Sequence, residues 1–229
     1  MTPYYQDCNN GITIYHGDCR KILPNLKGVT AIVTDPPYGT MLDTNYTRFK
    51  GEGHNKIYKP IEGDSDLFNP DHLLDYKNVI MFGYQYFAKW VDPGTILVWD
   101  KRFKNGSAFL ADGEIAWMKN YYGKIGPKTG GRGVYICSLT AQGFKRPEKT
   151  HHPTQKPVSL MEWCIRKLKR LKPGDVVCDP YMGVGSTLIA ARNLGFPAIG
   201  IEIEREYCDI AIERLKQTSI FGEMKSSSP

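Results

Sequence analysis

The sequence lacks the features that mark several classes of protein. No apolar run approaches the ~20 residues that span a bilayer, and residues 1–10 carry no basic-then-apolar signal pattern. The six cysteines include no Cys-x-x-Cys pair, which argues against a zinc site and a disulfide framework. We therefore expect buried free thiols, no membrane association and a cytoplasmic location. The length of 229 residues fits one α/β domain.

A metal site has little support in the sequence. His151 and His152 could be combined with Cys137, but no second pair of ligands stands at a spacing typical of a metal centre. We expect no bound metal.

Acidic residues are scarce in one segment. Residues 101–150 carry ten basic and three acidic side chains, a charge of +7 against +6 for the whole chain. Tyrosines and glycines are interleaved with the basic residues. Such a stretch is typical of nucleic-acid contact, although an ordinary solvated surface is the alternative. The candidates for DNA binding are Lys101, Arg102, Lys124, Lys128, Arg132, Lys145 and Arg146.

A short motif closes an apolar run near the N-terminus. Val29–Thr34 is β-branched and predicts a buried parallel strand, which must stop at Pro36 and Pro37. Asp35 and the Pro36 carbonyl would then stand as acceptors at the carboxyl end of the strand, beside Tyr38. In open α/β sheets, that edge is where ligands bind.

The acceptors suit a particular kind of chemistry. The exocyclic amino nitrogen of adenine or cytosine is a poor nucleophile, because its lone pair is delocalised into the ring. Two acceptors that hold its hydrogens favour a tetrahedral nitrogen, which frees the lone pair. Tyr38 could hold the base flat once it has left the stack. The alternative is that Asp-Pro-Pro-Tyr forms only a rigid turn.

A second motif, Asp179-Pro-Tyr-Met-Gly-Val-Gly185, favours the functional reading. It follows a predicted strand at 175–178, and its glycines permit a tight turn with close backbone approach. Ser186 or Thr187 would cap a helix over 188–194. A strand over 198–201 ends at Glu202, and an acid about 20 residues beyond such a turn is placed to bind ribose hydroxyls.

A nicotinamide dinucleotide is the second candidate for the ribose-bearing ligand. However, Leu188 stands where the dinucleotide fingerprint requires its third glycine. Asp179 would also repel a pyrophosphate, whereas its carboxylate suits the amino group and sulfonium of S-adenosylmethionine.

These motifs resemble those of S-adenosylmethionine-dependent DNA amino-methyltransferases of the permuted β group. Residues 35–38 match the catalytic motif, and residues 179–185 match the cofactor loop. His152 to Pro157 match a segment that lines the methionine end of the cofactor, and Tyr15 to Cys19 resemble a segment that contacts its adenine. The order of the motifs defines the β group. The resemblance covers about residues 11–215.

The resemblance implies the fold and the site residues. The fold would be a doubly wound, mostly parallel α/β sheet of the Rossmann-like methyltransferase type. The implied catalytic residues are Asp35, Pro36, Pro37 and Tyr38. The implied cofactor-binding residues are Asp18, Thr154, Gln155, Lys156, Pro157, Asp179, Tyr181, Gly183, Gly185, Ser186, Thr187 and Glu202.

The remaining segments complete the prediction. Strands are expected at 78–82 and 95–99 and helices at 84–90 and 158–171, with a loop over 39–75. Trp99 could pack against the other face of a flipped base, or it could be structural. A single domain would span residues 1–220, with 101–150 as a DNA-contact insertion and 221–229 as a flexible tail. The insertion has only about half the length of a target-recognition domain typical of the family.

We therefore predict methyl transfer from S-adenosylmethionine to adenine N6 in double-stranded DNA. Cytosine N4 is the runner-up, followed by an RNA base or a nucleic-acid-binding module without turnover. We expect a homodimer in a bacterial or phage-infected cell. The resemblance leaves open a cognate restriction endonuclease as a partner.

Overall fold

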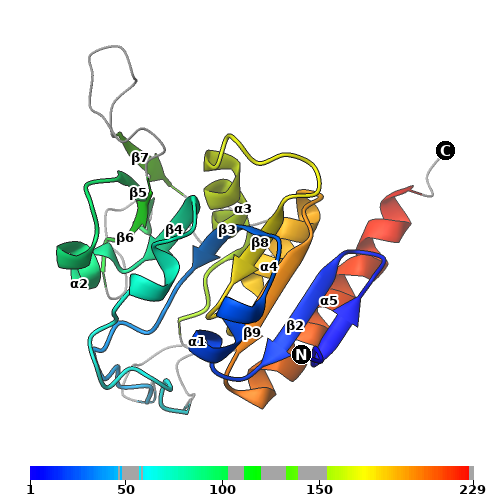
Figure 1. Ribbon diagram of the computed structural model, residues 1–229, viewed down its shortest axis with the longest axis horizontal. Coiled ribbons are helices and arrows are strands. Elements are labelled where there is room, and N and C mark those ends of the chain that lie inside the picture. Colours follow the sequence, from blue (N-terminus) through cyan, green and yellow to red (C-terminus); the bar gives the residue numbers. More distant parts are fainter. Residues whose placement is uncertain are drawn as a thin grey trace.

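The protein is built on one large mixed sheet, seen in a computed structural model that describes residues 1–45, 47, 57, 59–102, 111–119, 133–138 and 154–226 (Figure 1). Side chains are described up to residue 217. The sheet has nine strands in the order β1-β2-β9-β8-β3-β4-β6-β5-β7. The strands are β1 (Tyr5–Asp7), β2 (Ile12–His16), β3 (Val29–Thr34), β4 (Asn78–Phe82), β5 (Thr95–Asp100), β6 (Gly113–Met118), β7 (Val134–Cys137), β8 (Val176–Asp179) and β9 (Ala198–Glu202).

The central strands run in parallel. β2, β9, β8, β3 and β4 form a continuous parallel set, while β6 runs antiparallel between β4 and β5. β3 and β4 are apolar runs with both faces covered, as expected of parallel strands between two helical layers. The predicted doubly wound, mostly parallel sheet is confirmed.

Helices cover both faces of the sheet (Figure 1). α3, α4 and α5 pack on one face around a core that includes Val33, Leu160 and Leu188. On the other face, the shorter helices pack around a second core that includes Ile32, Phe87 and Cys178. The helices are α1 (Cys19–Ile22), η1 (Leu23–Asn25), η3 (Asp71–Leu73), α2 (Tyr84–Phe87), η4 (Ala88–Trp90), α3 (Val158–Lys167), α4 (Ser186–Asn193) and α5 (Arg205–Ser226).

Several element boundaries differ from the sequence prediction. α3 ends at Lys167 instead of residue 171, and the helix expected over 84–90 is divided into α2 and a 3-10 turn. α5 continues to Ser226, whereas the sequence predicts a frayed tail from residue 221. Five of the six cysteines are buried free thiols, as predicted, and Cys8 is exposed. In the described part of the chain, no helix is both long and apolar enough to cross a membrane.

The topology brings the two motifs to one point. β8 and β3 are adjacent and parallel, and the chain leaves them toward opposite sides of the sheet, β8 toward β9 and β3 toward β4. Such a reversal of strand order opens a crevice at the carboxyl ends of the strands. Because β6 is antiparallel, its first residues lie at the same edge as the last residues of β4 and β5.

Candidate active site

Asp35 lies directly after β3, and both of its carboxylate oxygens are bonded. Tyr38 donates its hydroxyl to Asp35 Oδ1 at 2.5 Å, across one turn of the Asp-Pro-Pro-Tyr segment. The ammonium group of Lys156 donates to Asp35 Oδ2. The motif is therefore more than a turn, because it presents a buried carboxylate that a distant segment holds.

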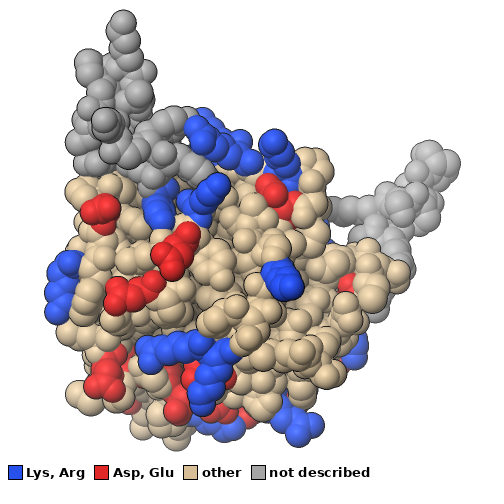
Figure 2. Space-filling view, in the orientation of Figure 1, with Lys and Arg blue, Asp and Glu red and all other residues tan. Residues whose placement is uncertain are grey.

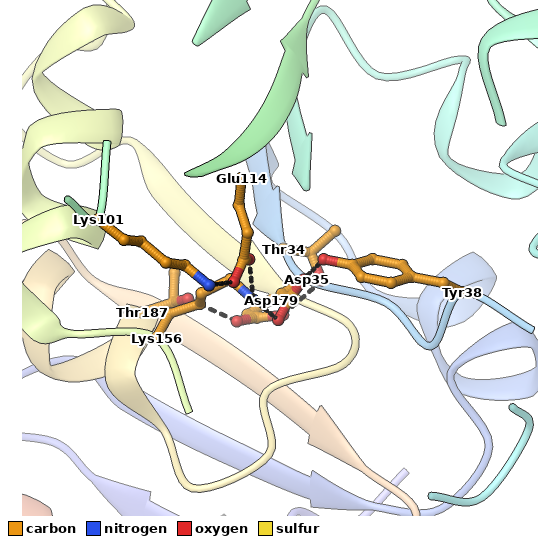
Figure 3. A network of polar contacts seen from close by, with 8 residues as sticks. All are labelled: Thr34, Asp35, Tyr38, Lys101, Glu114, Lys156, Asp179 and Thr187. Carbon is orange, nitrogen blue, oxygen red and sulfur yellow. Dashed lines mark hydrogen bonds and ion pairs between the residues drawn. The ribbon is translucent and has the colours of Figure 1, made fainter. Parts of the chain in front are cut away.

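Lys156 is shared between carboxylates. Its side chain is 6% exposed, and its Nζ lies 2.9 Å from Glu114 Oε2 on β6 as well as contacting Asp35. The other oxygen of Glu114 forms an ion pair with Lys101, which follows β5. In Figure 3, Lys101 and Lys156 reach in from the left and Glu114 from above, and Tyr38 approaches Asp35 from the right.

Burial and charge act against each other in this group. Desolvation raises the pKa of Asp35, and the neighbouring Lys156 ammonium opposes that rise. Although burial also disfavours ionisation of Glu114, the two lysines beside it hold its pKa at about 2. The two carboxylates hold the pKa of Lys156 above its ordinary value despite burial. Both carboxylates thus have a cationic partner in contact.

Tyr38 is held in place by two further residues. Its ring stacks on Tyr86 of α2, with centroids 4.9 Å apart and planes at 18°. Gly83, at the end of β4, has φ +81°, and a Cβ built there would lie 2.2 Å from Tyr38 Cε1. A side chain at position 83 would therefore displace the ring from its place beside Asp35.

The second motif forms a buried turn around Asp179. Thr34 donates its hydroxyl to Asp179 Oδ1 at 2.6 Å, and Thr187 donates to Oδ2 at 2.5 Å. The Tyr181 N–H also donates to Oδ1. Burial raises the pKa of Asp179 to about 6, although these hydrogen bonds favour the ionised form.

The predicted cap of the following helix is wrong. α4 begins at Ser186, and its N-cap is Gly185, in a left-handed conformation with φ +79° and without a side-chain cap. The hydroxyls of Ser186 and Thr187 are used elsewhere: Thr187 donates to Asp179, and Ser186 accepts from Arg214 at 3.3 Å. Gly183 also has a positive φ, so the expected tight turn is present.

Glu202 lies at the end of β9 and faces the same turn. Its Oε2 accepts from the Gly183 N–H at 2.9 Å, and its Oε1 accepts from the Glu204 N–H at 2.8 Å. Burial raises the pKa of Glu202 to about 7. Asp18, which caps α1, follows Gly17, whose N–H donates to the Glu202 carbonyl at 2.8 Å. Asp18 and Glu202 thus stand at adjacent strand ends.

One pocket joins the two motifs. We call it the edge pocket, because it opens at the carboxyl edge of the sheet. It is lined by Asp35, Thr154, Gln155, Lys156, Met161, Asp179, Tyr181, Met182, Val184, Ser186 and Thr187. Five of the predicted cofactor-binding residues do not line it: Asp18, Pro157, Gly183, Gly185 and Glu202. Pro157 is instead the N-cap of α3.

The pocket, together with Glu202 on the neighbouring turn, suits a ligand that carries both positive charge and a ribose. Asp179 and Glu202 are buried, and no lysine or arginine among the described residues forms an ion pair with either. Uncompensated buried carboxylates are costly, and a cationic group offsets that cost. The residues present therefore fit the amino group, sulfonium and ribose of S-adenosylmethionine.

Leu188 is used in packing, and this bears on the dinucleotide alternative. The residue is fully buried in α4, and a Cβ at Gly200 of β9 would lie 2.9 Å from Leu188 Cδ2. α4 therefore packs closely on the sheet because the strand residue, Gly200, is a glycine. In the dinucleotide fingerprint, the glycine that allows this contact lies on the helix, where this chain has Leu188.

The predicted DNA-binding residues have mixed positions. Lys101 lies inside the site on Glu114, with its Nζ 4.7 Å from the centroid of the Trp99 ring, instead of on an open basic surface. Arg102 forms an ion pair with Asp100 at 2.9 Å. Trp99 is partly buried and packs against the core. Lys124, Lys128, Arg132, Lys145 and Arg146 lie outside the described residues.

The charges on the visible face agree with this mixed picture. Figure 2 shows basic and acidic side chains interspersed over most of the face, with basic ones gathered along its upper edge in the region of α3. Arg166 and Lys167 lie in the last turn of α3.

Several residues of the site were not identified from the sequence: Gly83, Tyr86 and Glu114, Thr34, which bonds Asp179, and Met161, Met182 and Val184, which line the edge pocket. Glu114 is a carboxylate at the start of an otherwise apolar strand, and this pattern could have marked it. Tyr86 and Gly83 lie in a short helix and a turn, and nothing in their local pattern distinguishes them from packing residues.

Comparisons with known proteins agree with the geometry. A family model for N6/N4 methyltransferases, described as DNA methylase, matches residues 98–213. The type II methyltransferase M.HinfI of Haemophilus influenzae is 31% identical over 250 residues, which cover 90% of this chain and 68% of M.HinfI. The type II methyltransferase M.HpaI of Haemophilus parainfluenzae is 27% identical over 241 residues, covering 91% of this chain and 73% of M.HpaI.

Solved structures show the same fold. The crystal structure of an M1.HpyAVI–SAM complex matches with a TM-score of 0.53 and 29% identity, over 89% of this chain and 99% of that one. The cytosine-N4-specific PvuII DNA methyltransferase matches with a TM-score of 0.56 at 14% identity, over 92% and 87%, and that likeness concerns the fold alone. Because the family model covers just over half of the sequence and M.HinfI is matched over most of its length, the chain belongs to the N6/N4 DNA methylase family.

Proposed function

We propose that this protein transfers a methyl group from S-adenosylmethionine to the N6 amino group of adenine in double-stranded DNA. The observation that carries the proposal is the position of Asp35, which lines the same pocket as the buried carboxylate Asp179. An acceptor for an amino group and a site for a cationic methyl donor therefore share one pocket.

The cofactor half of the site is built from the second motif. Glu202 would accept the ribose hydroxyls, and Asp179 would face the positively charged end of the ligand. Asp18 would stand at the adenine end, near Glu202. When bound, S-adenosylmethionine supplies a methyl group whose bond to sulfur breaks as the new bond to nitrogen forms, with the electron pair passing to sulfur.

Asp35 acts on the amine. A carboxylate has about four lone-pair positions, so Asp35 can accept an amine hydrogen while Tyr38 and Lys156 remain bonded. Accepting that hydrogen favours a tetrahedral nitrogen with an available lone pair. The nitrogen carries one proton too many after methyl transfer, and the Asp35 carboxylate is the base of this chain that receives it.

The base reaches Asp35 only after it leaves the helix. An exocyclic amine inside a duplex is stacked and paired, so an enzyme that modifies it must extrude the nucleotide. The aromatic pair Tyr38 and Tyr86, next to Asp35, provides a stacking surface for the extruded base.

Analysis of the product tests the proposal. Duplex DNA of mixed sequence is incubated with the purified protein and S-adenosylmethionine, digested to nucleosides and analysed by mass spectrometry. We expect N6-methyladenine. N4-methylcytosine would contradict the choice of base and leave the reaction class intact, whereas no S-adenosylhomocysteine release with any duplex would contradict catalysis on DNA. An RNA of the same sequence is the matched control.

A further inference from the structure

Four side chains of alternating charge contact one another in turn and form a partly buried row, two members of which line the edge pocket (Figure 3). They are Lys101, Glu114, Lys156 and Asp35, whose side chains are 27%, 24%, 6% and 16% exposed. Each comes from a different segment: the chain after β5, β6, the approach to α3, and the chain after β3. The row runs from the end of β3 toward β6 and β5.

The contacts within the row are unequal. Lys156 is the most deeply buried member and touches two carboxylates, whereas Asp35 accepts from Lys156 and Tyr38. Glu114 Oε2, at 2.9 Å from Lys156 Nζ, lacks hydrogen-bonding geometry, so that contact is electrostatic. Lys101 holds the other oxygen of Glu114.

We propose that Lys156 is a positioning residue that keeps the Asp35 carboxylate ionised and oriented in the edge pocket, and that Glu114 shares the Lys156 ammonium so that Lys156 does not occupy Asp35 alone and lone pairs of the carboxylate remain available to the amine. The inference rests on the proposed role of Asp35. It gives Lys156 a role on the target amine, in place of the cofactor contact that the sequence implied.

The need for Lys156 follows from burial. An amine can be gripped only by an ionised carboxylate, since a protonated acid would offer a hydrogen of its own. Desolvation raises the pKa of Asp35, and Lys156 is the cation in contact that opposes this rise. The other ionisable groups that face Asp35 are Tyr38, Glu114 and Asp179, none of which is cationic.

The need for Glu114 follows from charge balance. If Asp35 were the only carboxylate in contact with Lys156, the ammonium group would offset the charge of Asp35 and compete with the amine for the lone pairs of that carboxylate. A second carboxylate 2.9 Å from the same ammonium spreads the positive charge over two partners. The charge of Glu114 raises the pKa of Asp35, which is opposite in sign to the effect of Lys156.

This difference in sign provides the test. The carboxyl carbon of Asp35 is followed by NMR against pH in cofactor-free protein labelled with 13C-aspartate, and its signal is assigned with Asp35→Asn. In Lys156→Met we expect the midpoint to rise by at least about one pH unit, a tenfold change in the acid dissociation constant. In Glu114→Gln, which keeps an acceptor at that place, we expect the midpoint to fall.

Conservative and functional controls accompany the titration. Lys156→Arg keeps the charge, so its midpoint should remain near that of the unsubstituted protein. The pH at which the single-turnover methylation rate falls on the acid side should change among the variants in the same direction as the Asp35 midpoint. Because Lys156 also lines the edge pocket, the methylation rate of Lys156→Met is measured at saturating S-adenosylmethionine. Lys156→Gln serves the same test if the methionine variant does not fold.

Clear results would overturn the inference. An unchanged Asp35 midpoint in Lys156→Met would show that Lys156 does not hold that carboxylate ionised. A rise of the midpoint in Glu114→Gln would contradict the sharing of the ammonium. Full methylation by Asp35→Asn would instead refute the role of Asp35 in the proposed function, while the titration in cofactor-free protein would still test the electrostatic relationship.

Discussion

The hydroxyl of Thr34, the last residue of β3, donates a hydrogen bond to Asp179, the last residue of β8, at 2.6 Å. The two residues are 145 positions apart in the chain, and both are buried. The residue after Thr34 is the proposed acceptor of the target amine, and Asp179 begins the turn that we assign to the cofactor. This hydrogen bond and the pairing of β3 with β8 hold the two halves of the site side by side.

Loss of the Asp35 carboxylate should abolish most turnover. Because Asp35 acts on the amine, Asp35→Ala should reduce methylation by roughly 10²- to 10⁴-fold, the range for a positioned acid or base. Cofactor affinity, measured by titration calorimetry, should be nearly intact. Methylation close to normal by a folded Asp35→Ala protein would contradict the assignment.

Loss of the Glu202 carboxylate should weaken the cofactor complex. Hydrogen bonds to a charged group contribute ~1.5–3 kcal/mol each, so Glu202→Ala should reduce S-adenosylmethionine affinity at least about tenfold. Asp179→Ala should weaken it as well. Unchanged affinity in both variants, measured by calorimetry, would show that neither Asp179 of the edge pocket nor Glu202 on the neighbouring turn holds the cofactor.

The same carboxylates predict how cofactor affinity depends on pH. The pKa of Glu202 is about 7 and that of Asp179 about 6, and the proposed contacts require their ionised forms. Affinity should therefore fall as pH is lowered through 7, and more steeply below 6. In Glu202→Gln, calorimetry should show that the dependence between pH 7 and 6 is largely lost.

The stability of the cofactor-free protein should change with pH in the opposite sense. The pKa of Glu202 is raised from 4.5 to about 7, so the folded state favours the protonated acid. The contribution of Glu202 to the free energy of unfolding is at most ~3 kcal/mol. It is fully present below pH 4.5 and is lost as pH rises to 7. Urea unfolding at pH 5 and 8 should show a smaller difference in Glu202→Gln.

A methyl group at Gly83 should disturb the catalytic motif. Its Cβ would lie 2.2 Å from the Tyr38 ring, so Gly83→Ala should slow methylation and lower the unfolding temperature. Gly174 offers a matched control, because its φ is +90° and nothing lies within 4 Å of a Cβ built there. Gly174→Ala should cost only the left-handed backbone penalty of ~1–2 kcal/mol and leave the rate unchanged. Equal rates in the two variants would show that the Tyr38 position does not matter.

The basic segment predicts salt-dependent DNA binding. Each neutralised phosphate contributes about −0.9 to the slope of log affinity against log salt, so three to five contacts give a slope of roughly −3 to −4.5. Replacing Lys124, Lys128 and Arg132 together with alanine should flatten the slope by about two units. It should weaken binding to every DNA sequence by a similar factor. An unchanged slope would remove the segment from the DNA interface.

So small a footprint on DNA also predicts a homodimer in which the second subunit extends the basic surface. Light scattering of the protein with and without duplex DNA measures this directly. A species of about 26 kDa that remains monomeric on DNA at working concentrations would end the dimer prediction.

The local signals in the sequence were sufficient for the two motifs and for β3, β4, β5, β8 and β9, whereas β1, β2, β6 and β7 were not predicted. Apolar β-branched runs, two prolines after Asp35, and glycines with positive φ at positions 183 and 185 each act through the backbone of their own segment. Such effects need no distant partner, so the ends of β3 and β8 and the turn after Asp179 were predicted within one residue.

The side-chain partners were decided only by the tertiary structure. Glu114 reaches Lys156 because β6 is antiparallel, which brings its first residues to the carboxyl edge of the sheet. Thr187 donates to Asp179 instead of capping α4, because a buried carboxylate needs hydrogen-bond donors. Gly185 is the N-cap of α4 and makes the turn into the helix. Strand direction and burial arise from the whole sheet, so no local pattern could reveal that Asp35, Glu114 and Lys156 form one group.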